Sequence, residues 1–268
     1  MPETTNQPKT RYFKTPEKLA QGTSQNQDVT KSIVTSIVVD YKTDPEAAAE
    51  CIPPHLTPNT EGLVRATLSN VDVQLGAMNF EFGSVTVAIP CEHEGEQGSY
   101  CLHMYMNQET PVVAGREIYG EPKKIADIDF SRQGNQISFT ATRHFCPFIQ
   151  FKGEIVGAAL PTTTTQYPMF VYKAFPAIDG NGFEYPPRLN RLRVENEQQE
   201  LYKMDGELVL SDSPLDPIAD LPVREIVAIH YEVGNARSSG EFIKEVPGDD
   251  LAGYFHQRND DLDALLGG

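Results

Sequence analysis

The most informative ten residues of this sequence are Gly115-Arg116-Glu117-Ile118-Tyr119-Gly120-Glu121-Pro122-Lys123-Lys124. Two adjacent lysines follow a Gly-x-Pro turn, and the segments on both sides have the composition of apolar strands. Lysine is rarely buried, because its ammonium group loses hydration when it leaves water. A neutral amine in an apolar pocket, however, is a nucleophile that attacks ketones and forms an imine. The pattern therefore indicates an imine-forming lysine where the chain enters a core.

The two lysines are expected to point in opposite directions. Pro122 disfavours a helical conformation for Glu121 and favours an extended one. Side chains alternate between the two faces of an extended segment, so Lys123 and Lys124 face opposite sides. We expect one lysine to enter the interior and the other to remain in water.

Around this stretch the chain has mainly the pattern of β-strands. Segments rich in β-branched and aromatic residues are 32–41, 63–73, 84–91, 100–106 and 136–143. A helix is expected after Asp44, with Pro45 in its first turn, and a weaker helix signal covers 222–229. We expect one α+β domain at residues 29–258, mainly antiparallel β, with a closed or nearly closed barrel or cone-like sheet and a few short helices. A polar N-terminal arm (1–28) and an acidic tail (259–268) flank it.

The charge of the chain excludes some classes of partner. Its 268 residues carry a net charge of -16, which argues against binding to nucleic acid or to an anionic membrane surface. No apolar run approaches the roughly 18 residues of a transmembrane helix, and the N-terminus lacks a signal-peptide core. We expect a soluble, cytoplasmic protein that uses no cofactor.

The lysine stretch resembles the signature of the acetoacetate decarboxylase superfamily, Gly-Arg-Glu-[Leu/Ile]-x-x-x-Pro-Lys-Lys. The matching residues are Gly115, Arg116, Glu117, Ile118, Pro122, Lys123 and Lys124. Further resemblance runs over about residues 32–235, including Tyr41-Lys42-Thr43-Asp44, Leu63-Val64-Arg65 and Leu102-His103-Met104. It implies that Lys123 forms an imine with a small oxo acid, beside the cation of Lys124. It also implies supporting roles for Arg116 and Glu117, and a homo-oligomer.

The chain departs from the decarboxylating members of that superfamily around the lysine. Val34 stands where they carry an arginine, and Thr67 stands where they carry a glutamate. Glu81 matches their third polar residue and is expected to be catalytic. Glu121 takes a position that is usually aromatic or apolar, and an extended segment places it on the face of Lys123. There it would favour the charged amine, unless it points into solvent at the turn or is protonated and acts as a proton donor.

These departures lead to a functional hypothesis. We expect a carbon–carbon lyase that forms a Schiff base at Lys123 and reacts through an imine and enamine, with weak or absent decarboxylation of acetoacetate. Polar groups at Thr67, Glu81 and Glu121 suit a site that adds an aldehyde and eliminates water. An aldolase–dehydratase that condenses pyruvate-like oxo acids with aldehydes is therefore the alternative. Tyr105, on the preceding strand, is expected either to line the pocket or to belong to the core.

Two hypotheses from other classes stay open. A non-catalytic binding protein would keep the fold and lose the chemistry. A metal site is the second, because side chains two residues apart share one face of a strand and both types bind zinc. Its ligands would be Cys91, His93, Cys101 and His103. Neither pair has the two-residue gap of common zinc knuckles, so packed or surface side chains are the simpler interpretation.

Overall fold

The computed structural model describes residues 10, 12–20, 30–75, 78–161, 163–165, 168–255, 258 and 260. The expected N-terminal arm lies largely outside the described residues, apart from a short helix at 16–20 and its neighbours. Of the expected tail, only Asp260 is described.

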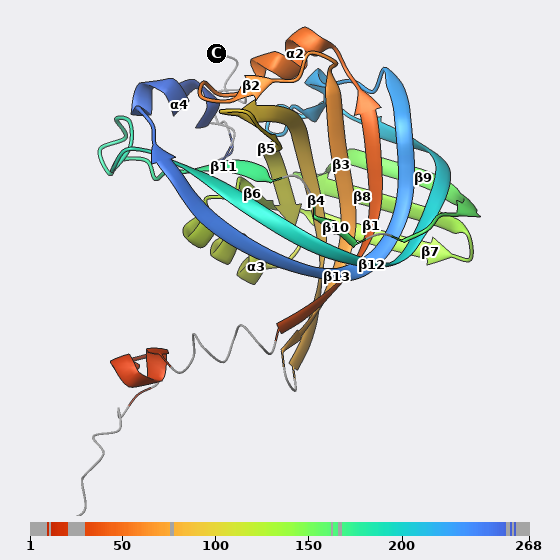
Figure 1. Ribbon diagram of the computed structural model, residues 1–268, viewed down its shortest axis with the longest axis horizontal. Coiled ribbons are helices and arrows are strands. Elements are labelled where there is room, and N and C mark those ends of the chain that lie inside the picture. Colours follow the sequence, from red (N-terminus) through yellow and green to blue (C-terminus); the bar gives the residue numbers. More distant parts are fainter. Residues whose placement is uncertain are drawn as a thin grey trace, which may run out of the picture.

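Strands dominate the described part of the chain (Figure 1). They are β1 (Thr30–Lys42), β2 (Thr57–Pro58), β3 (Leu63–Leu75), β4 (Met78–His93), β5 (Glu96–Met106), β6 (Lys123–Ile125), β7 (Asp127–Gln133), β8 (Gln136–Arg143), β9 (Cys146–Ala158), β10 (Thr163–Thr165), β11 (Met169–Lys173), β12 (Arg188–Leu210) and β13 (Glu225–Glu245). The helices and turns are α2 (Pro45–Glu50), α3 (Glu109–Ala114), the π-helical turn η1 (Gly115–Tyr119), the 3₁₀ turn η2 (Ile218–Asp220) and α4 (Gly248–Phe255).

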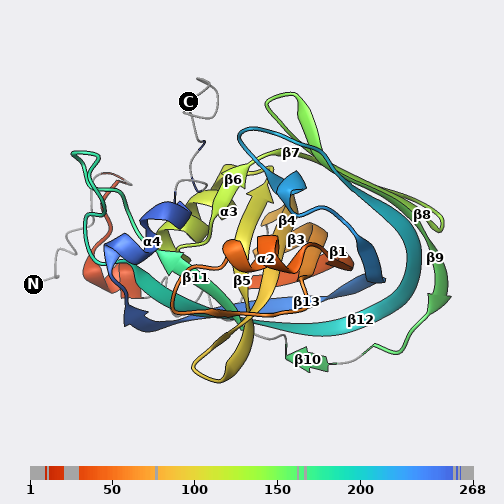
Figure 2. The same ribbon diagram turned by 90° about the horizontal axis from the view of Figure 1, so that it is seen from above.

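Seven strands close into a ring in the order β11-β5-β4-β3-β1-β13-β12, and β11 pairs with β12 to complete it. All neighbours in the ring are antiparallel except β11 and β5. The far half of β12 pairs with β9, which continues into β8 and β7. In Figures 1 and 2, β12 and β13 are long and strongly curved, and β12 connects the ring to this extension. The expected mainly antiparallel, closed sheet is confirmed.

The hydrophobic core lies outside the ring, between one wall of the ring and the β7–β9 extension. Alternate residues of β1 show this arrangement, since Ile37 and Val39 are fully buried in the core while Ser36 and Val38 line a cavity inside the ring. Phe139 of β8 and Phe151 of β9 close the core from the other side. The ring strands therefore alternate apolar residues that face the core with residues, many of them polar, that face the cavity, such as Ser36, Thr67 and Ser69.

The short helices lie at the ends of the sheet. α2 begins as expected, because the Asp44 side chain accepts a hydrogen bond from the backbone N–H of Glu46 at 3.0 Å. It sits at the end of the ring strands in Figure 2. The weak helix signal at 222–229 is wrong, because β13 begins at Glu225 and its backbone pairs with β1, Tyr41 opposite Ile226.

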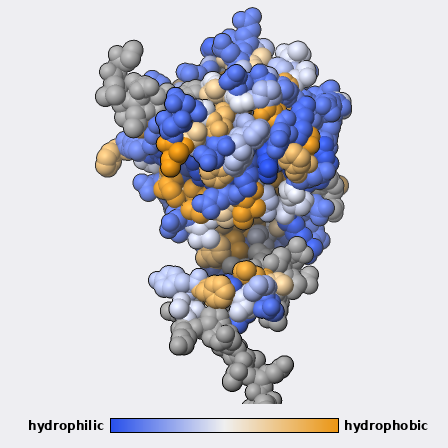
Figure 3. All heavy atoms as spheres, turned by 90° about the vertical axis from the view of Figure 1, so that its left-hand side faces the viewer, coloured by the Kyte–Doolittle hydropathy of each residue, from blue (hydrophilic) through white to orange (hydrophobic). Residues whose placement is uncertain are grey.

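The face shown in Figure 3 is largely hydrophilic, and apolar side chains gather near its middle between charged ones. Within the described part of the chain, no helix combines the length and the apolar character that crossing a membrane requires.

Candidate active site

The lysine stretch forms a sharp turn between a helix and a strand. α3 runs into η1, and Gly120 then reverses the chain with φ 86°, its N–H bonded to the carbonyl of Gly115 at 3.0 Å. A Cβ on residue 120 would lie 2.4 Å from the Cα of Lys173, so only glycine fits this left-handed, close-packed position. β6 follows and pairs in parallel with β5, which places Lys123 opposite Met104 and Lys124 opposite Tyr105.

The two lysines point to opposite faces of β6, and both are buried. Lys123 is 9% exposed and faces the cavity inside the ring, and Lys124 is 6% exposed and faces the core side. The expectation that one lysine remains in water is wrong, because a cluster of charged side chains receives Lys124 (below).

The cavity inside the ring has a volume of about 1000 Å³. Lys123 and Glu121 line it together with Val34 and Thr67, so four of the expected pocket and catalytic positions meet in one space. The pairing of neighbouring strands places two threonines in line with Lys123. Lys123 lies opposite Met104 of β5, Met104 lies opposite Thr86 of β4, and Thr86 lies opposite Thr67 of β3. We call this line of paired residues the row of Lys123. The cavity thus presents one amine, one carboxylate and a partly polar wall to a ligand.

Glu121 is buried and lies on the face of Lys123, as the extended conformation predicts. Its Oε2 is 2.7 Å from Lys123 Nζ, an ion-pair distance, although the directions of the groups do not make a hydrogen bond. The alternative of a solvent-facing Glu121 is therefore contradicted. A carboxylate at this distance is placed to take a proton from the amine.

Gly115 makes room for this pair. A Cβ at position 115 would lie 2.2 Å from Glu121 Oε2 and 2.6 Å from Lys123 Nζ. The backbone of Gly115 is ordinary right-handed helix, φ −64° and ψ −44°, so alanine fits the backbone and only the side-chain space is tested.

We expect Gly115→Ala to slow imine formation at Lys123 on the order of 100-fold, because a displacement of about 1 Å at a reacting group has this effect. The measurement is the rate of borohydride trapping of an oxo acid by intact mass. Gly157→Ala is the matched control, since a Cβ there meets nothing within 4 Å. Equal rates for both variants would contradict the assigned role of Gly115.

Lys124 enters a buried cluster of alternating charges on the other face of β6. Its Nζ lies 3.1 Å from Oδ1 of Asp216 and donates to the carbonyl of Leu215 at 3.0 Å. Asp216 is 0% exposed and accepts further hydrogen bonds from Arg143 Nε at 2.8 Å and from the Tyr105 hydroxyl at 3.1 Å. Asp260 contacts both Lys124, at 3.5 Å, and Arg143. The charge of Lys124 is thus compensated by carboxylates, and the side chain anchors β6 to the loop after β12.

Tyr105 belongs to this cluster and to the core. It is fully buried, and its ring packs edge-on against Phe148 with 4.7 Å between ring centroids. Burial and the adjacent Asp216 carboxylate raise the pKa of Tyr105 well above its usual value. Burial and the charge of Lys124 lower the pKa of the neighbouring His103 to about 4, so its ring is neutral near pH 7.

Arg116 holds the turn that carries Lys123 through hydrogen bonds to backbone carbonyls. Its Nη1 donates to the carbonyl of Lys123 at 2.9 Å and to that of Arg258 at 2.8 Å. Arg258 in turn donates to the carbonyls of Gly120 and Tyr172. Burial lowers the pKa of Arg258 to about 10, so the group stays charged near neutral pH. Glu117, the other residue expected to support the loop, is exposed.

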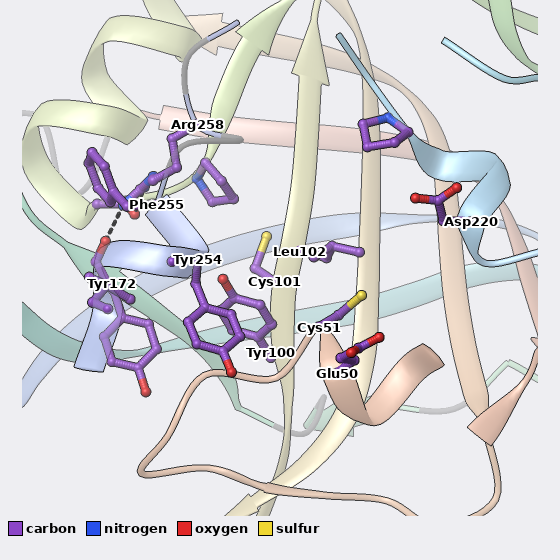
Figure 4. A pocket seen from close by; sticks show the side chains of 15 residues that line it. Glu50, Cys51, Tyr100, Cys101, Leu102, Tyr172, Asp220, Tyr254, Phe255 and Arg258 are labelled. Atoms are coloured by element: carbon purple, nitrogen blue, oxygen red, sulfur yellow. Dashed lines mark hydrogen bonds between the residues drawn. The ribbon is translucent and has the colours of Figure 1, made fainter. Parts of the chain in front are cut away.

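A smaller pocket of about 260 Å³ lies beside this contact, with Gly120 and Pro122 in its lining. In Figure 4, Arg258, Phe255 and Tyr172 gather at one end of it, and Cys51, Glu50 and Asp220 lie at the other. Lys123 is absent from its lining, so this space is separate from the cavity of the ring.

Glu81 does not join Lys123 in the cavity, and the four proposed metal ligands do not form their separate site. Glu81 is exposed on β4 while its neighbour Phe82 lines the cavity, because successive strand residues face opposite sides. Glu81 is not among the described residues that line the cavity of Lys123. The proposed metal ligands are dispersed as well: Nδ1 of His93 lies 2.9 Å from the carbonyl of His55, and His103 stacks on Tyr105. Among the described residues, no three His, Cys, Asp or Glu side chains are arranged to hold a metal ion.

Comparison with known proteins points to one family. The sequence model of the acetoacetate decarboxylase (ADC) family matches residues 14–243. An acetoacetate decarboxylase of Burkholderia cenocepacia (strain HI2424) is 30% identical over 210 residues, covering 74% of this chain and 81% of that protein. One of Bordetella avium (strain 197N) is 30% identical over 207 residues, covering 74% and 80%.

Solved structures share the fold. The enduracididine biosynthesis enzyme MppR, complexed with pyruvate, has a TM-score of 0.70 at 20% identity, covering 81% of this chain and 90% of that one. Acetoacetate decarboxylase from Legionella pneumophila has a TM-score of 0.68 at 18% identity, covering 81% and 87%.

Proposed function

The chain belongs to the acetoacetate decarboxylase family and is a lyase-type enzyme, and on that premise we propose that it forms a Schiff base between Lys123 and a small oxo acid. The observation that carries the proposal is the pair of Lys123 and Glu121 in the cavity, with 2.7 Å between Nζ and Oε2. A buried amine with a carboxylate as its proton acceptor is the arrangement that imine formation needs.

The pair accounts for each proton of imine formation. Glu121 takes a proton from the Lys123 ammonium group, and the neutral amine attacks the keto carbon of the oxo acid. The attack gives an adduct with a positive nitrogen and a negative oxygen. A proton then moves from this nitrogen to the oxygen, which gives a neutral carbinolamine. Glu121 returns its proton to the carbinolamine hydroxyl, water leaves, and a protonated imine remains. The positive nitrogen then draws electrons from the adjacent C–C bond and stabilises an enamine.

Decarboxylation of acetoacetate is proposed to be weak or absent. Val34 and Thr67 line the cavity at positions where the decarboxylating members are expected to carry an arginine and a glutamate. Among the described residues that line the cavity, Arg65 is paired with Asp40 at 2.7 Å, and Arg237 is exposed. Neither arginine is available beside Lys123 to hold the substrate carboxylate.

A second candidate is aldol addition followed by dehydration. The cavity of about 1000 Å³ lies at the upper end of the roughly 300–1000 Å³ of typical ligand pockets, so a three-carbon oxo acid leaves space for an aldehyde. The hydroxyl groups of Thr67 and Thr86 lie in the row of Lys123, where they can contact a new hydroxyl. One solved structure that shares this fold is that of MppR complexed with the condensation product of pyruvate and imidazole 4-carboxaldehyde.

Borohydride trapping tests the proposal. The protein is incubated separately with pyruvate and with acetoacetate, reduced, and analysed by intact mass and peptide mapping. We expect a pyruvate adduct on Lys123 that keeps its carboxylate, and little adduct of the mass of reduced acetone imine from acetoacetate. An abundant acetone-type adduct on Lys123 would establish decarboxylation. No adduct from either acid would overturn imine formation with these substrates and favour a binding protein.

A further inference from the structure

A buried carboxylate that has no cationic partner in the described part of the chain lies across the ring from the lysine loop. Glu232 of β13 is 7% exposed and lines the same cavity as Lys123. Its hydrogen-bond donors are two neutral amides of β12: Asn196 Nδ2 to Oε1 at 3.3 Å and Gln198 Nε2 to Oε2 at 2.5 Å. Among the described residues it makes no ion pair within 4.0 Å. A buried carboxylate normally has a cation as its partner, because the isolated charge loses its hydration.

The other charges of the cavity wall are compensated or remote. Asp40 and Arg65 form one ion pair, and Glu121 and Lys123 form another. The hydrogen bond to Asp40 raises the pKa of Arg65, with a smaller contribution from the charge of Glu232, so Arg65 acts on Glu232 from a distance. Arg237 is exposed and lies five residues further along β13. Glu232 is therefore the buried charge of this cavity that lacks a contact of opposite sign in the described chain.

A second acceptor beside Glu232 also lacks a hydrogen-bond partner among the described residues. Asn196 is 5% exposed and lines the cavity, and its Oδ1 is buried without a hydrogen bond. Gly234 provides the space for this oxygen, since a Cβ there would lie 2.3 Å from it. A buried amide oxygen normally accepts a hydrogen bond, so the free oxygen points to a donor that comes from outside the chain.

The position of Glu232 fits the far end of a substrate attached to Lys123. In the ring, β4, β3 and β1 separate β5 from β13 on one side, and β11 and β12 separate them on the other. A row of residues in register crosses four successive strands of the ring: Ser84, Ser69, Ser36 and Glu232. It lies two residues along the strands from the row that contains Thr86 and Thr67, and the side chains of both rows face the cavity. A polar track therefore leads from the wall beside the lysine to the carboxylate.

We propose that Glu232 and the free oxygen of Asn196 form a binding site for a cationic nitrogen group, such as a primary ammonium, at the end of the substrate that is distant from Lys123. The assignment rests on the proposed function, because it names the class of molecule that extends through the cavity from the reacting carbon. An ammonium group brings a positive charge and three N–H donors to two buried acceptors, the Glu232 carboxylate and the Asn196 Oδ1.

Calorimetric titration of the full chain with butylammonium chloride tests the site without any imine chemistry. We expect saturable binding to the wild type, and weaker binding of butan-1-ol, which has the same chain length and no charge. Glu232→Gln should weaken butylammonium binding at least about tenfold, because a charge-assisted hydrogen bond is roughly twice as strong as a neutral one. Glu197→Gln is the matched control, since Glu197 is the exposed neighbour of Asn196 on β12 and its replacement changes the net charge equally.

The outcomes separate this proposal from the proposed function. Equal affinity of wild type and Glu232→Gln, equal affinity for butylammonium and butan-1-ol, or no saturable binding would each overturn the ammonium site. The comparison of the two ligands uses the wild type alone, so it decides the matter even where Glu232→Gln fails to fold. Pyruvate trapping by the wild type is measured in parallel. If pyruvate is trapped but butylammonium does not bind, the Schiff-base proposal stands and the ammonium site is overturned. If butylammonium binds but pyruvate is not trapped, the ammonium site stands and imine formation with pyruvate is overturned.

Discussion

Replacement of Asp216 by alanine is expected to lower the free energy of unfolding by on the order of 3–5 kcal/mol, the range for breaking a buried ion pair by removing one partner. Asp216 is fully buried and is the common acceptor for Lys124, Arg143 and the Tyr105 hydroxyl. The alanine variant leaves two cations in the interior, with only the half-buried Asp260 to compensate them. Desolvation of the orphaned cations, rather than loss of packing, causes most of the effect.

Urea unfolding and thermal melting of Asp216→Ala and Asp212→Ala provide the measurement. Asp212 is exposed on the same loop, so its replacement should change stability by less than about 0.5 kcal/mol. At roughly 2–4 °C per kcal/mol, the melting temperature of Asp216→Ala should fall on the order of 10 °C. A difference between the variants of under 1 kcal/mol would mean that water reaches the cluster and that Lys124 does not depend on Asp216.

The local features of the fold were predictable because their causes are local. The Asp44 cap, the strands with alternating residues and the opposite faces of Lys123 and Lys124 follow from backbone geometry over a few residues. The proximity of Glu121 to Lys123 follows from the same alternation. The weak helix signal at 222–229 failed because pairing of β13 with β1 depends on a strand almost 200 residues away, which overrides local propensity.

The partners of Lys124 were not predictable from sequence spacing. Asp216 and Arg143 lie 92 and 19 residues from Lys124 along the chain, and only the packing of the β7–β9 extension against the ring brings them together. The expectation that one of the two lysines remains in water relied on the rarity of buried lysines, a rule that holds only where no carboxylate compensates the charge. Glu81 illustrates a different limit, since a shift of one residue in a strand moves a side chain to the opposite face.

Replacement of Glu121 by glutamine is expected to lower the maximal rate of imine formation by about 10²–10⁴-fold, the range for loss of a general acid or base. The amide keeps the shape of the side chain but neither takes the proton of Lys123 nor returns one to the carbinolamine hydroxyl. The rate of borohydride trapping of pyruvate, measured from pH 5 to pH 10, gives this value as the plateau of the pH profile. Lys123→Ala sets the baseline, with no adduct at this position at any pH.

Glu109→Gln is the matched control for this substitution, since Glu109 is exposed at the start of α3 and its replacement changes the net charge equally. It should leave the plateau unchanged. Oε2 of Glu121 lies 2.7 Å from Lys123 Nζ, which places the carboxylate to take a proton from the amine. An equal plateau for Glu121→Gln and the wild type would show that this carboxylate transfers no proton during imine formation. A plateau that falls in Glu121→Gln and not in Glu109→Gln is the result expected of a carboxylate that both takes the proton of the amine and returns it to the carbinolamine hydroxyl.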